Sequence, residues 1–367
     1  MQPASTGLQP HEITPWRNPI RHRECTRCNH SVAWPPARAK PVYSTRQTER
    51  GIRVSAGIVN QMFLDLPLVS IVTPAYNADR FLADTIESVL QQDYPKIEYT
   101  VVASDSNDET HEILSRYRGR VGSISVPRQG PASAIHTGLV QARGSILAWL
   151  NADDTYEPGA IRAAVETLLA HPEADVVYGD ACWMDEHGAL LRPYPTMAFD
   201  PSALARDCFI CQPASFFRAP AYAACSLDLS LTVSFDYDLW ISMALRGCRF
   251  QHIPQRMANS RMHRDNLTLS RHGEVLEVSM ALLRKYYGYV PVSWVFGYLA
   301  YRRDGRDQFF EPLRYSPLTY VASLPFGLRL NRRHALRFLA EWAWTPVRGI
   351  RRALLRGRTT DPGLASG

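Results

Sequence analysis

Short apolar runs alternate with segments of helical periodicity from residue 68 onward. The run 68–74, LVSIVTP, is typical of a buried strand, and in 79–93 the residues Leu82, Ile86 and Val89 fall on one face of a helix. The same alternation predicts further strands at 97–104, 122–127, 145–151 and 174–181, and further helices at 108–119, 131–144 and 157–172. Strands separated by helices predict an α/β fold, in which helices cover both faces of a mostly parallel sheet.

The pattern changes in the second half of the chain. After Asp236 it becomes helical, and from about residue 275 it indicates an appended helical region. Residues 1–61 are rich in Pro, Arg, Thr and Ser without a sustained apolar period, which is typical of a disordered segment. We therefore expect three parts, which are a disordered basic leader at 1–64, an α/β domain at 65–272, and a helical, basic and amphipathic extension at 273–367.

Two features of the leader bear on its chemistry and its origin. In the stretch HRECTRCNH, Cys25 and Cys28 are spaced as C-x-x-C between His22 and His30. A structural zinc site usually combines two well-separated ligand pairs, so this stretch supplies half of a site at best. Met62 directly precedes the first predicted strand and is an alternative start of translation.

Charge is unevenly distributed along the chain. The net charge of +6 divides into +6 for residues 1–61, −7 for 62–325 and +7 for 326–367. Basic flanks are either solvated tails or segments attracted to an anionic surface. In the last of these ranges, Leu336 and Leu339 recur at helical spacing with Trp342 among arginines, which fits an interfacial membrane anchor and equally a helix packed on its own domain. Nucleic-acid binding would rest on flank charge alone, and we expect none.

The cysteines and the longest apolar runs indicate a compartment. The seven cysteines are odd in number and follow no disulfide pattern, which favours a reducing environment. Residues 1–20 lack the apolar core of a signal peptide, and no run reaches the roughly 18 apolar residues of a membrane span. We expect a cytoplasmic protein, and the basic extension leaves open a place at the inner face of the plasma membrane.

Acidic residues gather at the predicted ends of the strands, where an open parallel sheet binds its ligands. The stretches at these ends are TPAYN (73–77), ASDSND (103–108) and NADD (151–154). Neither a dinucleotide fingerprint nor a P-loop motif follows the first strand. A nucleotide diphosphate beside such acids requires a bridging divalent cation, and hard oxygen ligands select Mg²⁺ or Mn²⁺. Taken alone, however, Asp153 and Asp154 are better explained as acids at the start of the helix near Pro158.

An ordered set of motifs changes this interpretation. Residues 69–102, VSIVTPAYNADRFLADTIESVLQQDYPKIEYTVV, and 144–160, GSILAWLNADDTYEPGA, resemble the opening and the D-x-D metal element of family 2 glycosyltransferases of the GT-A fold. The stretches ADVVYGDACWMDEHGALL, FICQPASFFR, FDYDLWISMALRG and MHRDNLTLS then follow in the order usual for that family. The resemblance covers about residues 66–272. It implies a Rossmann-like sheet and an inverting, metal-dependent transfer of a sugar from a nucleotide-diphosphate sugar to a hydroxyl of a glycan or lipid-linked glycan.

The resemblance also implies which residues bind the donor. Thr73, Ala75 and Tyr76 would line the uracil-type base and the ribose, and Asp105 would be available to the base. Asp153 would lie against hydroxyl groups of the ribose or the sugar. These roles come from the positions that match the family's motifs.

A second group of residues is implied in metal binding and catalysis. Asp154 would be the principal ligand of Mn²⁺ or Mg²⁺ on the diphosphate, and His263 would reach the same ion. Asp236 would be the general base that takes the proton of the acceptor hydroxyl. Gln212 would lie on the acceptor side, and Asp238 would support that side or the start of the helix. One base and one metal suffice for a single displacement, because the metal stabilises charge on the leaving diphosphate.

Structural explanations exist for several of these residues. Asp236 is also suited to capping the helix that follows it, and a lone histidine such as His263 is often a hydrogen-bonded structural residue. Trp149 and Trp240 are expected in the core rather than against a sugar.

Two stretches depart from the family pattern. Ala103 and Ser104 occupy positions where family members carry acids after the second strand. The predicted helix 131–144 carries Ser133, His136 and Thr137 where relatives have Asp, Asn and Lys. These departures keep open an alternative function, that of a degenerate, non-catalytic member that binds nucleotide or glycan. The intact Asp153, Asp154 and Asp236 favour the enzyme.

Overall fold

A computed structural model describes residues 66–356, with side chains through residue 345. The predicted leader 1–64, its C-x-x-C stretch and Met62 lie outside the described residues. The predicted strands and helices of the α/β part are all present, with ends that differ by a few residues. The first half of the sheet consists of β1 (Val69–Ala75), β2 (Ile97–Ser104), β3 (Gly122–Val126) and β4 (Ile146–Trp149).

The remaining strands complete a nine-stranded sheet in the part of the chain that the structure describes. They are β5 (Thr155–Tyr156), β6 (Val176–Met184), β7 (Leu190–Pro193), β8 (Ser215–Arg218) and β9 (Phe250–Arg261). The strand order is β3-β2-β1-β4-β8-β6-β9-β5, and β7 pairs with β6. Most paired residues belong to parallel neighbours, as expected, whereas β8 runs antiparallel to β4 and β6.

The order of the strands positions the candidate site. The chain leaves β1 toward β2 and β3, and then returns to place β4 on the other side of β1. The strand order therefore switches between β1 and β4, and the carboxyl ends of these strands meet there. The stretches TPAYN and NADD follow these two ends.

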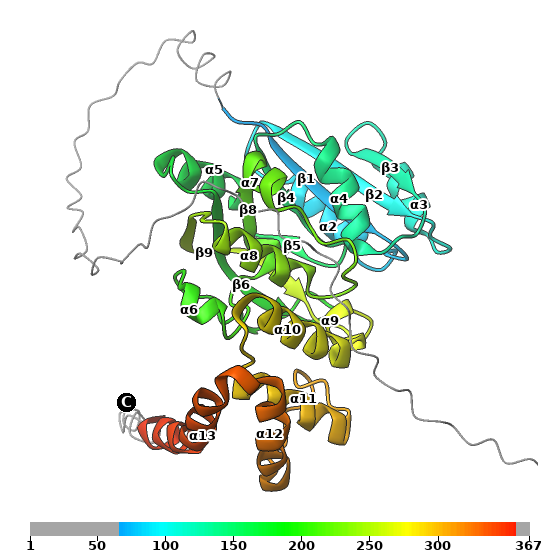
Figure 1. Cartoon of the computed structure of the whole chain (residues 1–367). Helices are drawn as coiled ribbons and strands as arrows, with labels where there is room; N and C mark the ends of the chain where they lie inside the picture. Colours follow the sequence, from blue (N-terminus) through cyan, green and yellow to red (C-terminus); the bar gives the residue numbers. More distant parts are fainter. Residues whose placement is uncertain (1–65, 357–367) are drawn as a thin grey trace, which may run out of the picture. The chain divides into compact units, whose positions relative to one another are not determined.

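Helices cover both faces of the sheet (Figure 1). One face packs against α2 (Leu82–Leu90), α3 (Thr110–Arg116) and α5 (Ala160–Ala170), and the other against α4 (Pro131–Gln141), α7 (Ala219–Cys225) and α8 (Phe235–Leu245). Trp149 and Trp240 stack in the second layer with ring centroids 5.8 Å apart and are fully buried, which confirms that both belong to the core. Short elements complete this part, namely α6 (Pro201–Leu204), the 3₁₀ turn η1 (Gln212–Ala214) and α9 (Leu267–Ser270).

Strand β9 corrects the expectation that the chain is helical after Asp236. Its sequence, FQHIPQRMANSR, lacks a strict apolar alternation because only its second half is mainly buried. The strand runs parallel to β6, shifts register beside Asp180, and then pairs antiparallel with β5. Through this path β9 carries Arg261 to the turn that follows β4.

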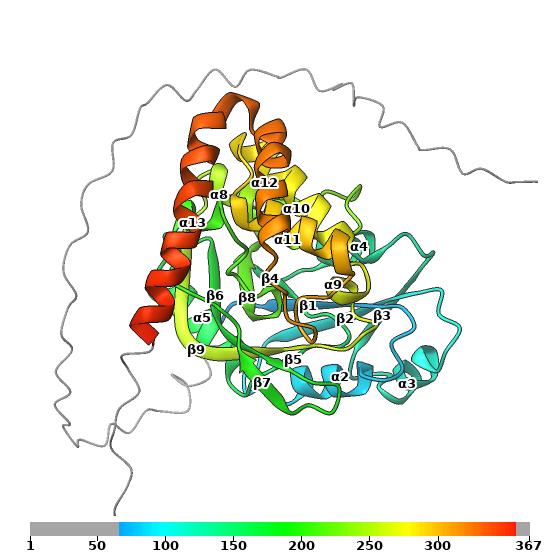
Figure 2. The same cartoon turned by 90° about the horizontal axis from the view of Figure 1, so that it is seen from below.

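The appended helical region consists of four long helices and one short turn. They are α10 (His272–Tyr287), α11 (Val292–Asp304), α12 (Pro317–Leu330), η2 (Arg332–His334) and α13 (Ala335–Arg356). Figure 2 shows α10, α11 and α12 on the side of the sheet opposite to α2 and α3. No helix within residues 66–356 is long and apolar enough to cross a membrane.

These helices have a hydrophobic cluster of their own. It includes Tyr289, Val295, Tyr320 and Phe338, whereas Leu283 of α10 packs into the core of the sheet. Buried Asn331 joins the turn after α12 to the start of α11, because its amide exchanges hydrogen bonds with the backbone N–H and C=O of Val290 at 2.7 and 3.0 Å. Since α10 contributes to both cores, the domain division at residue 273 stays a prediction.

We predict that Gly327→Ala destabilises the protein, because a methyl group at this position of α12 would overlap the buried ring of Phe338 in α13. Overpacking of this kind lowers the free energy of unfolding by about 1–3 kcal/mol. Gly297→Ala in α11 is the matched control, since its nearest neighbour would be Gln308 Oε1 at 3.5 Å, and it should be neutral or stabilising by up to about 1 kcal/mol. Urea unfolding measures both variants, and equal stabilities would contradict this packing.

Candidate active site

The turn after β4 is held by three elements. Leu150 continues the β1 pairing by donating its N–H to Val72 O at 2.9 Å, and Asp154 N–H then closes a turn onto Asn151 O at 3.1 Å. Thr85 of α2 donates its hydroxyl to Asp154 O at 2.8 Å. The chain next forms β5, which pairs with β9. The backbone of the NADD stretch is therefore fixed from the side of α2 and from the side of β9.

Asp154 is a buried carboxylate that is held by neutral donors. Its Oδ1 accepts the backbone N–H of Arg261 at 2.9 Å, and its Oδ2 accepts the side-chain amide of Asn151 at 3.2 Å. No Lys, Arg or His side chain within residues 66–345 forms an ion pair with Asp154. Burial, followed by the charge of neighbouring Asp153, raises the pKa of Asp154 well above its usual range. The site thus lacks the positive charge that an ionised carboxylate at this position requires.

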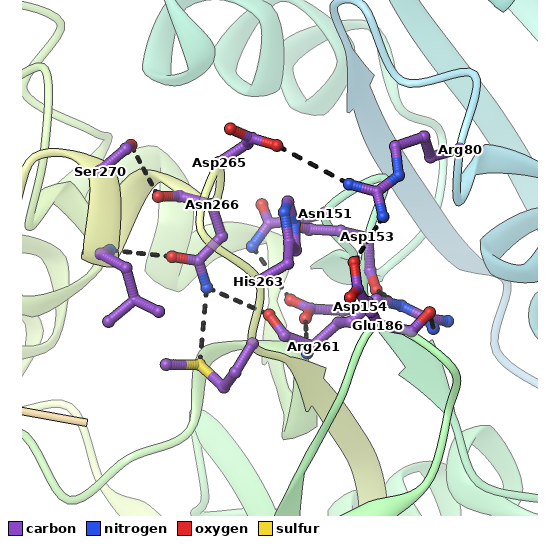
Figure 3. Close-up of polar contacts among 12 residues, drawn as sticks. Arg80, Asn151, Asp153, Asp154, Glu186, Arg261, His263, Asp265, Asn266 and Ser270 are labelled. Atoms are coloured by element: carbon purple, nitrogen blue, oxygen red, sulfur yellow. Dashed lines mark hydrogen bonds and ion pairs between the residues drawn. The ribbon is translucent and has the colours of Figure 1, made fainter. Parts of the chain in front are cut away.

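Arg261 organises the turn without neutralising Asp154. Its guanidinium is almost fully buried and donates from Nε to Asp153 O at 2.9 Å and from Nη1 to Glu186 O at 3.1 Å (Figure 3). It also reaches Asp84 Oδ2 at 3.2 Å. The sequence did not predict this residue as part of the site. The one feature of the sequence that could have indicated a role at the site is that Arg261 directly precedes the MHRDN stretch.

His263 follows β9 and faces Asp153. Its Nε2 lies 3.2 Å from Asp153 Oδ2, and its ring packs against Phe81 with centroids 4.9 Å apart. Its Nδ1 is buried without a hydrogen-bond partner among the described residues. When Nε2 carries the proton and donates it to Asp153, Nδ1 keeps a free lone pair. His263 therefore has the character of an available ligand rather than of a fully satisfied structural histidine.

The donor set fits a divalent ion that a ligand completes. The described residues contain no group of three His, Cys, Asp or Glu side chains arranged to hold a metal. Mg²⁺ and Mn²⁺ sites on phosphorylated substrates commonly use only one or two protein carboxylates, with phosphate oxygens and water at the other positions. Asp154 and Asp153 match that requirement, and His263 lies beside Asp153 with its Nε2 toward that carboxylate.

Asp236 reaches the same cavity from the start of α8. The N-cap residue is Ser234, which has φ of 55° and a hydroxyl 3.1 Å from Ser279 Oγ in α10. Such a conformation is strained for a residue other than glycine and is often found at functional sites. Asp236 lies two residues further on, so it does not occupy the N-cap position. Burial raises the pKa of Asp236, while hydrogen bonds from the backbone at Tyr237 and Asp236 limit the rise.

These residues surround one cavity of about 820 Å³. Tyr76 lies at its wall with the Arg128 guanidinium 4.1 Å from the ring centroid, and Arg80 pairs with Glu186 at 2.6 Å and with Asp265 at 3.7 Å. Trp294 of α11 also lines the cavity and donates its indole N–H to Arg206 O at 2.6 Å. The appended helices therefore contribute to the wall of the candidate site.

Most of the predicted site residues meet in this cavity. Those that line it are Ala75, Tyr76, Asp153, Asp154, Gln212, Asp236 and His263. They come from the ends of β1, β4 and β9, from η1 and from α8. Their meeting brings together residues that are widely separated in the sequence, although their individual roles stay predictions.

Thr73 and Asp105 do not line the cavity, and their roles at the donor stay predictions. Thr73 is fully buried on the same face of β1 as Ile71, and its hydroxyl lies 3.0 Å from Tyr99 OH. Asp105 directly follows β2 and is exposed. The loop beyond it instead fastens to the loop after β1, because Asp108 accepts the N–H of Asp79 at 3.0 Å.

The two acceptor-side residues also differ from expectation. Asp238 faces α10, where its Oδ1 accepts the hydroxyl of Tyr286 at 2.8 Å and lies 3.4 Å from Lys285 Nζ, so its placement at the acceptor is corrected. Gln212 lines the cavity, but its amide is used within the protein. Its Nε2 donates to Trp149 O at 2.7 Å and its Oε1 accepts from Asn151 at 3.1 Å, which steadies the residue that contacts Asp154.

Comparisons with known proteins agree with this geometry. The family model described as Glycosyl transferase family 2 matches residues 70–194. The chain is 28% identical over 229 residues to an uncharacterized glycosyltransferase of Rickettsia felis, covering 58% of this chain and 37% of that protein. It is 27% identical over 240 residues to a chondroitin synthase of Escherichia coli, covering 62% of this chain and 35% of that protein. The chain thus spans about a third of the length of each of these two relatives.

A solved structure supports the fold. TarS from S. aureus, solved in complex with UDP-GlcNAc, aligns with a TM-score of 0.52 and 15% identity, covering 72% of this chain and 81% of that one. The α/β sheet with its flanking helices is the GT-A fold. Residues 70–194 carry the match to glycosyltransferase family 2, and the two relatives are named as a glycosyltransferase and a chondroitin synthase.

We predict that Arg261→Lys destabilises the protein, because an ammonium group cannot replace the three contacts of the buried guanidinium. The loss should be about 1–3 kcal/mol, as expected when buried polar partners are left unsatisfied. Arg162→Lys is the matched control, since that guanidinium pairs with Asp93 on the surface and such pairs contribute little. Chemical denaturation of the two variants decides the point, and similar losses would show that Arg261 does not organise the turn.

Proposed function

We propose that this chain transfers a sugar from a nucleotide-diphosphate sugar to a hydroxyl acceptor, with a divalent cation and with inversion. One observation carries the proposal, which is that the buried Asp154 carboxylate, without an ion-pair partner among residues 66–345, shares a cavity with a second perturbed acid, Asp236. Two acids in different environments suit two different tasks. The family match over residues 70–194 supports the reaction class.

The donor would occupy the part of the cavity near the ends of β1 and β4. Tyr76 offers a ring face to a base, and Ala75 leaves room beside it. Arg128 adds positive charge at the same wall. A UDP-sugar is the first donor to test, since TarS was solved with UDP-GlcNAc.

Asp154 would be the principal protein ligand of the ion, with His263 Nδ1 and Asp153 beside it. When bound, Mn²⁺ or Mg²⁺ supplies positive charge for the leaving diphosphate. Asn151 and the N–H of Arg261 orient the Asp154 carboxylate. Asp153 keeps the proton of His263 on Nε2 and so leaves Nδ1 available.

Asp236 would take the proton of the acceptor hydroxyl. Burial raises its pKa, which makes it a stronger base than an exposed aspartate. A single base supports one displacement, and one displacement inverts the anomeric centre. The acceptor is a glycan or a lipid-linked glycan, and the relative named chondroitin synthase supports the glycan class.

The alternative is a family member that binds nucleotide or glycan without turnover. It is favoured by the region after β2, where Ala103 and Ser104 replace acids and Asp105 is exposed. We place the protein in the cytoplasm, at the inner face of the membrane when it acts on a lipid-linked acceptor.

Substitutions of the two acids should separate binding from turnover. Asp154→Asn should abolish the Mn²⁺-dependent rise in melting temperature that UDP produces in the wild type, a rise of about 5 °C at saturating ligand. Asp236→Asn should keep that rise but lower turnover of the matching UDP-sugar by about 10²–10⁴-fold. Asp93→Asn is the matched control, because this exposed residue after α2 does not line the cavity, and it should change neither quantity.

A panel of UDP-, GDP- and dTDP-sugars, each with Mn²⁺, identifies the donor in the same assays. Stabilisation that survives Asp154→Asn would refute the metal assignment. Binding without turnover for every donor and acceptor tested would establish the degenerate alternative.

The raised pKa of Asp236 predicts opposite effects on activity and stability. The base must be ionised, so kcat/KM should fall as pH decreases through a pKa above the ordinary value of about 3.9. Because the pKa is raised in the folded state, stability from this group is present below the unfolded pKa and is lost as pH rises through the folded pKa. Asp236→Asn should therefore melt at a higher temperature than the wild type at pH 7, with the difference vanishing near pH 4. An equal difference at both pH values would refute the perturbed pKa.

A further inference from the structure

Helix α12 exposes an apolar stripe to solvent. Positions at intervals of three and four residues face outward, and Leu318 is 83% exposed there. The opposite face carries the buried side chains of Tyr320 and Ser323 and packs against α13. The residues of the α12 stripe are Leu318, Val321, Ala322, Pro325 and, at its end, Arg329.

Helix α13 carries a second stripe of the same kind. Phe338 and Trp342 pack inward, and Trp342 stacks on Tyr320 with ring centroids 4.9 Å apart. Trp344, by contrast, is 61% exposed and Leu336 is 83% exposed. The residues of the α13 stripe within the described side chains are Leu336, Leu339, Ala340, Ala343 and Trp344.

The charge around the two stripes is positive. Residues 312–345 contain five arginines and a single acid, Glu341. Glu341 is occupied, because it accepts the hydroxyl of Tyr289 and the N–H of Val292. Arg329, Arg332 and Arg333 are exposed at the end of α12 and in the turn before α13. A solvated helix face would be polar, so apolar stripes edged by arginine indicate an apolar partner with negative charge.

We propose that the α12 and α13 stripes bind the surface of an anionic phospholipid bilayer, with their apolar side chains among the acyl chains. Leucine, valine and tryptophan suit the boundary below the headgroups, while the arginines meet lipid phosphates. A second copy of this chain fits the surface less well. A two-fold contact sets the same patch against itself, which would bring the arginines of both copies together.

The sequence pattern indicated a membrane contact only within 326–367. The α12 stripe lies before that range and enlarges the surface, whereas side chains beyond residue 345 lie outside the description. Trp294 of α11 lines the candidate site, and α11 packs in the same hydrophobic cluster as Tyr320 and Phe338. Bilayer binding does not depend on the proposed function. A role in bringing the cavity to a lipid-linked acceptor does rest on it.

Cosedimentation of the full chain with vesicles tests the proposal. The wild type should bind vesicles of phosphatidylcholine mixed with phosphatidylglycerol, and bind those of phosphatidylcholine alone much more weakly. Leu318→Glu and Leu336→Glu should each weaken binding by about tenfold or more, since each removes an apolar side chain from the lipid and adds like charge. Leu169→Glu is the matched control, because this residue of α5 is 58% exposed on another element, and it should bind like the wild type.

The arginines are tested by charge removal. Arg332→Gln combined with Arg333→Gln should weaken binding to the anionic vesicles, whereas Arg118→Gln, an exposed residue after α3, should not. Because the altered side chains are exposed, all variants should melt within a few degrees of the wild type, and a variant that does not is replaced by Val321→Glu or Leu339→Glu.

Several results would overturn the proposal. They are an absence of binding to anionic vesicles, Leu318→Glu and Leu336→Glu variants that bind as well as Leu169→Glu, and a dimer that Leu318→Glu dissociates while no vesicle is bound. Thermal stabilisation by UDP and Mn²⁺ is measured without vesicles on the same samples. Loss of that stabilisation would count against the proposed function but not against bilayer binding. A failure to bind vesicles would count against bilayer binding but not against the proposed function.

Discussion

The central constraint on this structure is a buried negative charge at the edge of the sheet. Asp154 follows β4, is shielded from water, and sits next to a second carboxylate. Its hydrogen-bond partners, a backbone N–H and a side-chain amide, orient the group but carry no net charge. A protein that only needed to fold would gain from a neutral residue here, since burying an ionised carboxylate without a counter-charge is costly. Retaining the acid makes sense if a cation and a diphosphate complete the arrangement.

Much of the surrounding architecture serves this turn. Helix α2 supplies Thr85 to its backbone, η1 supplies Gln212 to Asn151, and β9 supplies both the N–H and the guanidinium of Arg261. Asp236 arrives from a different layer, on a helix whose first residues are set by the strained Ser234 and its contact to α10. The two acids are therefore positioned by separate elements, which allows their environments to differ. In the proposed reaction, Asp154 would share its charge with an ion and Asp236 would accept a proton.

The fold and the meeting of the main site residues could be predicted from the sequence, and the failures have physical reasons. The run that became β4 is apolar throughout and the run that became β1 is mostly so, because both faces of the strands are covered, so their ends were recognisable. Strand β9 was missed because its burial is uneven, and with it the role of Arg261. Thr73 does not reach the cavity because it lies within β1, where both faces of the strand are buried, whereas Pro74 and Ala75 at the end of the strand do reach it. Asp238 was misplaced because its position in α8 turns it toward α10 and Tyr286.

The departures after β2 and in α4 leave Asp153, Asp154 and Asp236 in place, so the proposed chemistry depends on whether Asp154 holds an ion jointly with a diphosphate. Without three suitable side chains among the described residues, the protein alone should hold such an ion weakly. Titration with Mn²⁺ followed by electron paramagnetic resonance tests this most directly. The wild type should take up one Mn²⁺ tightly only when UDP is present, and Asp154→Ala should not. Uptake by Asp154→Ala with the affinity of the wild type, in the presence of UDP, would contradict the account.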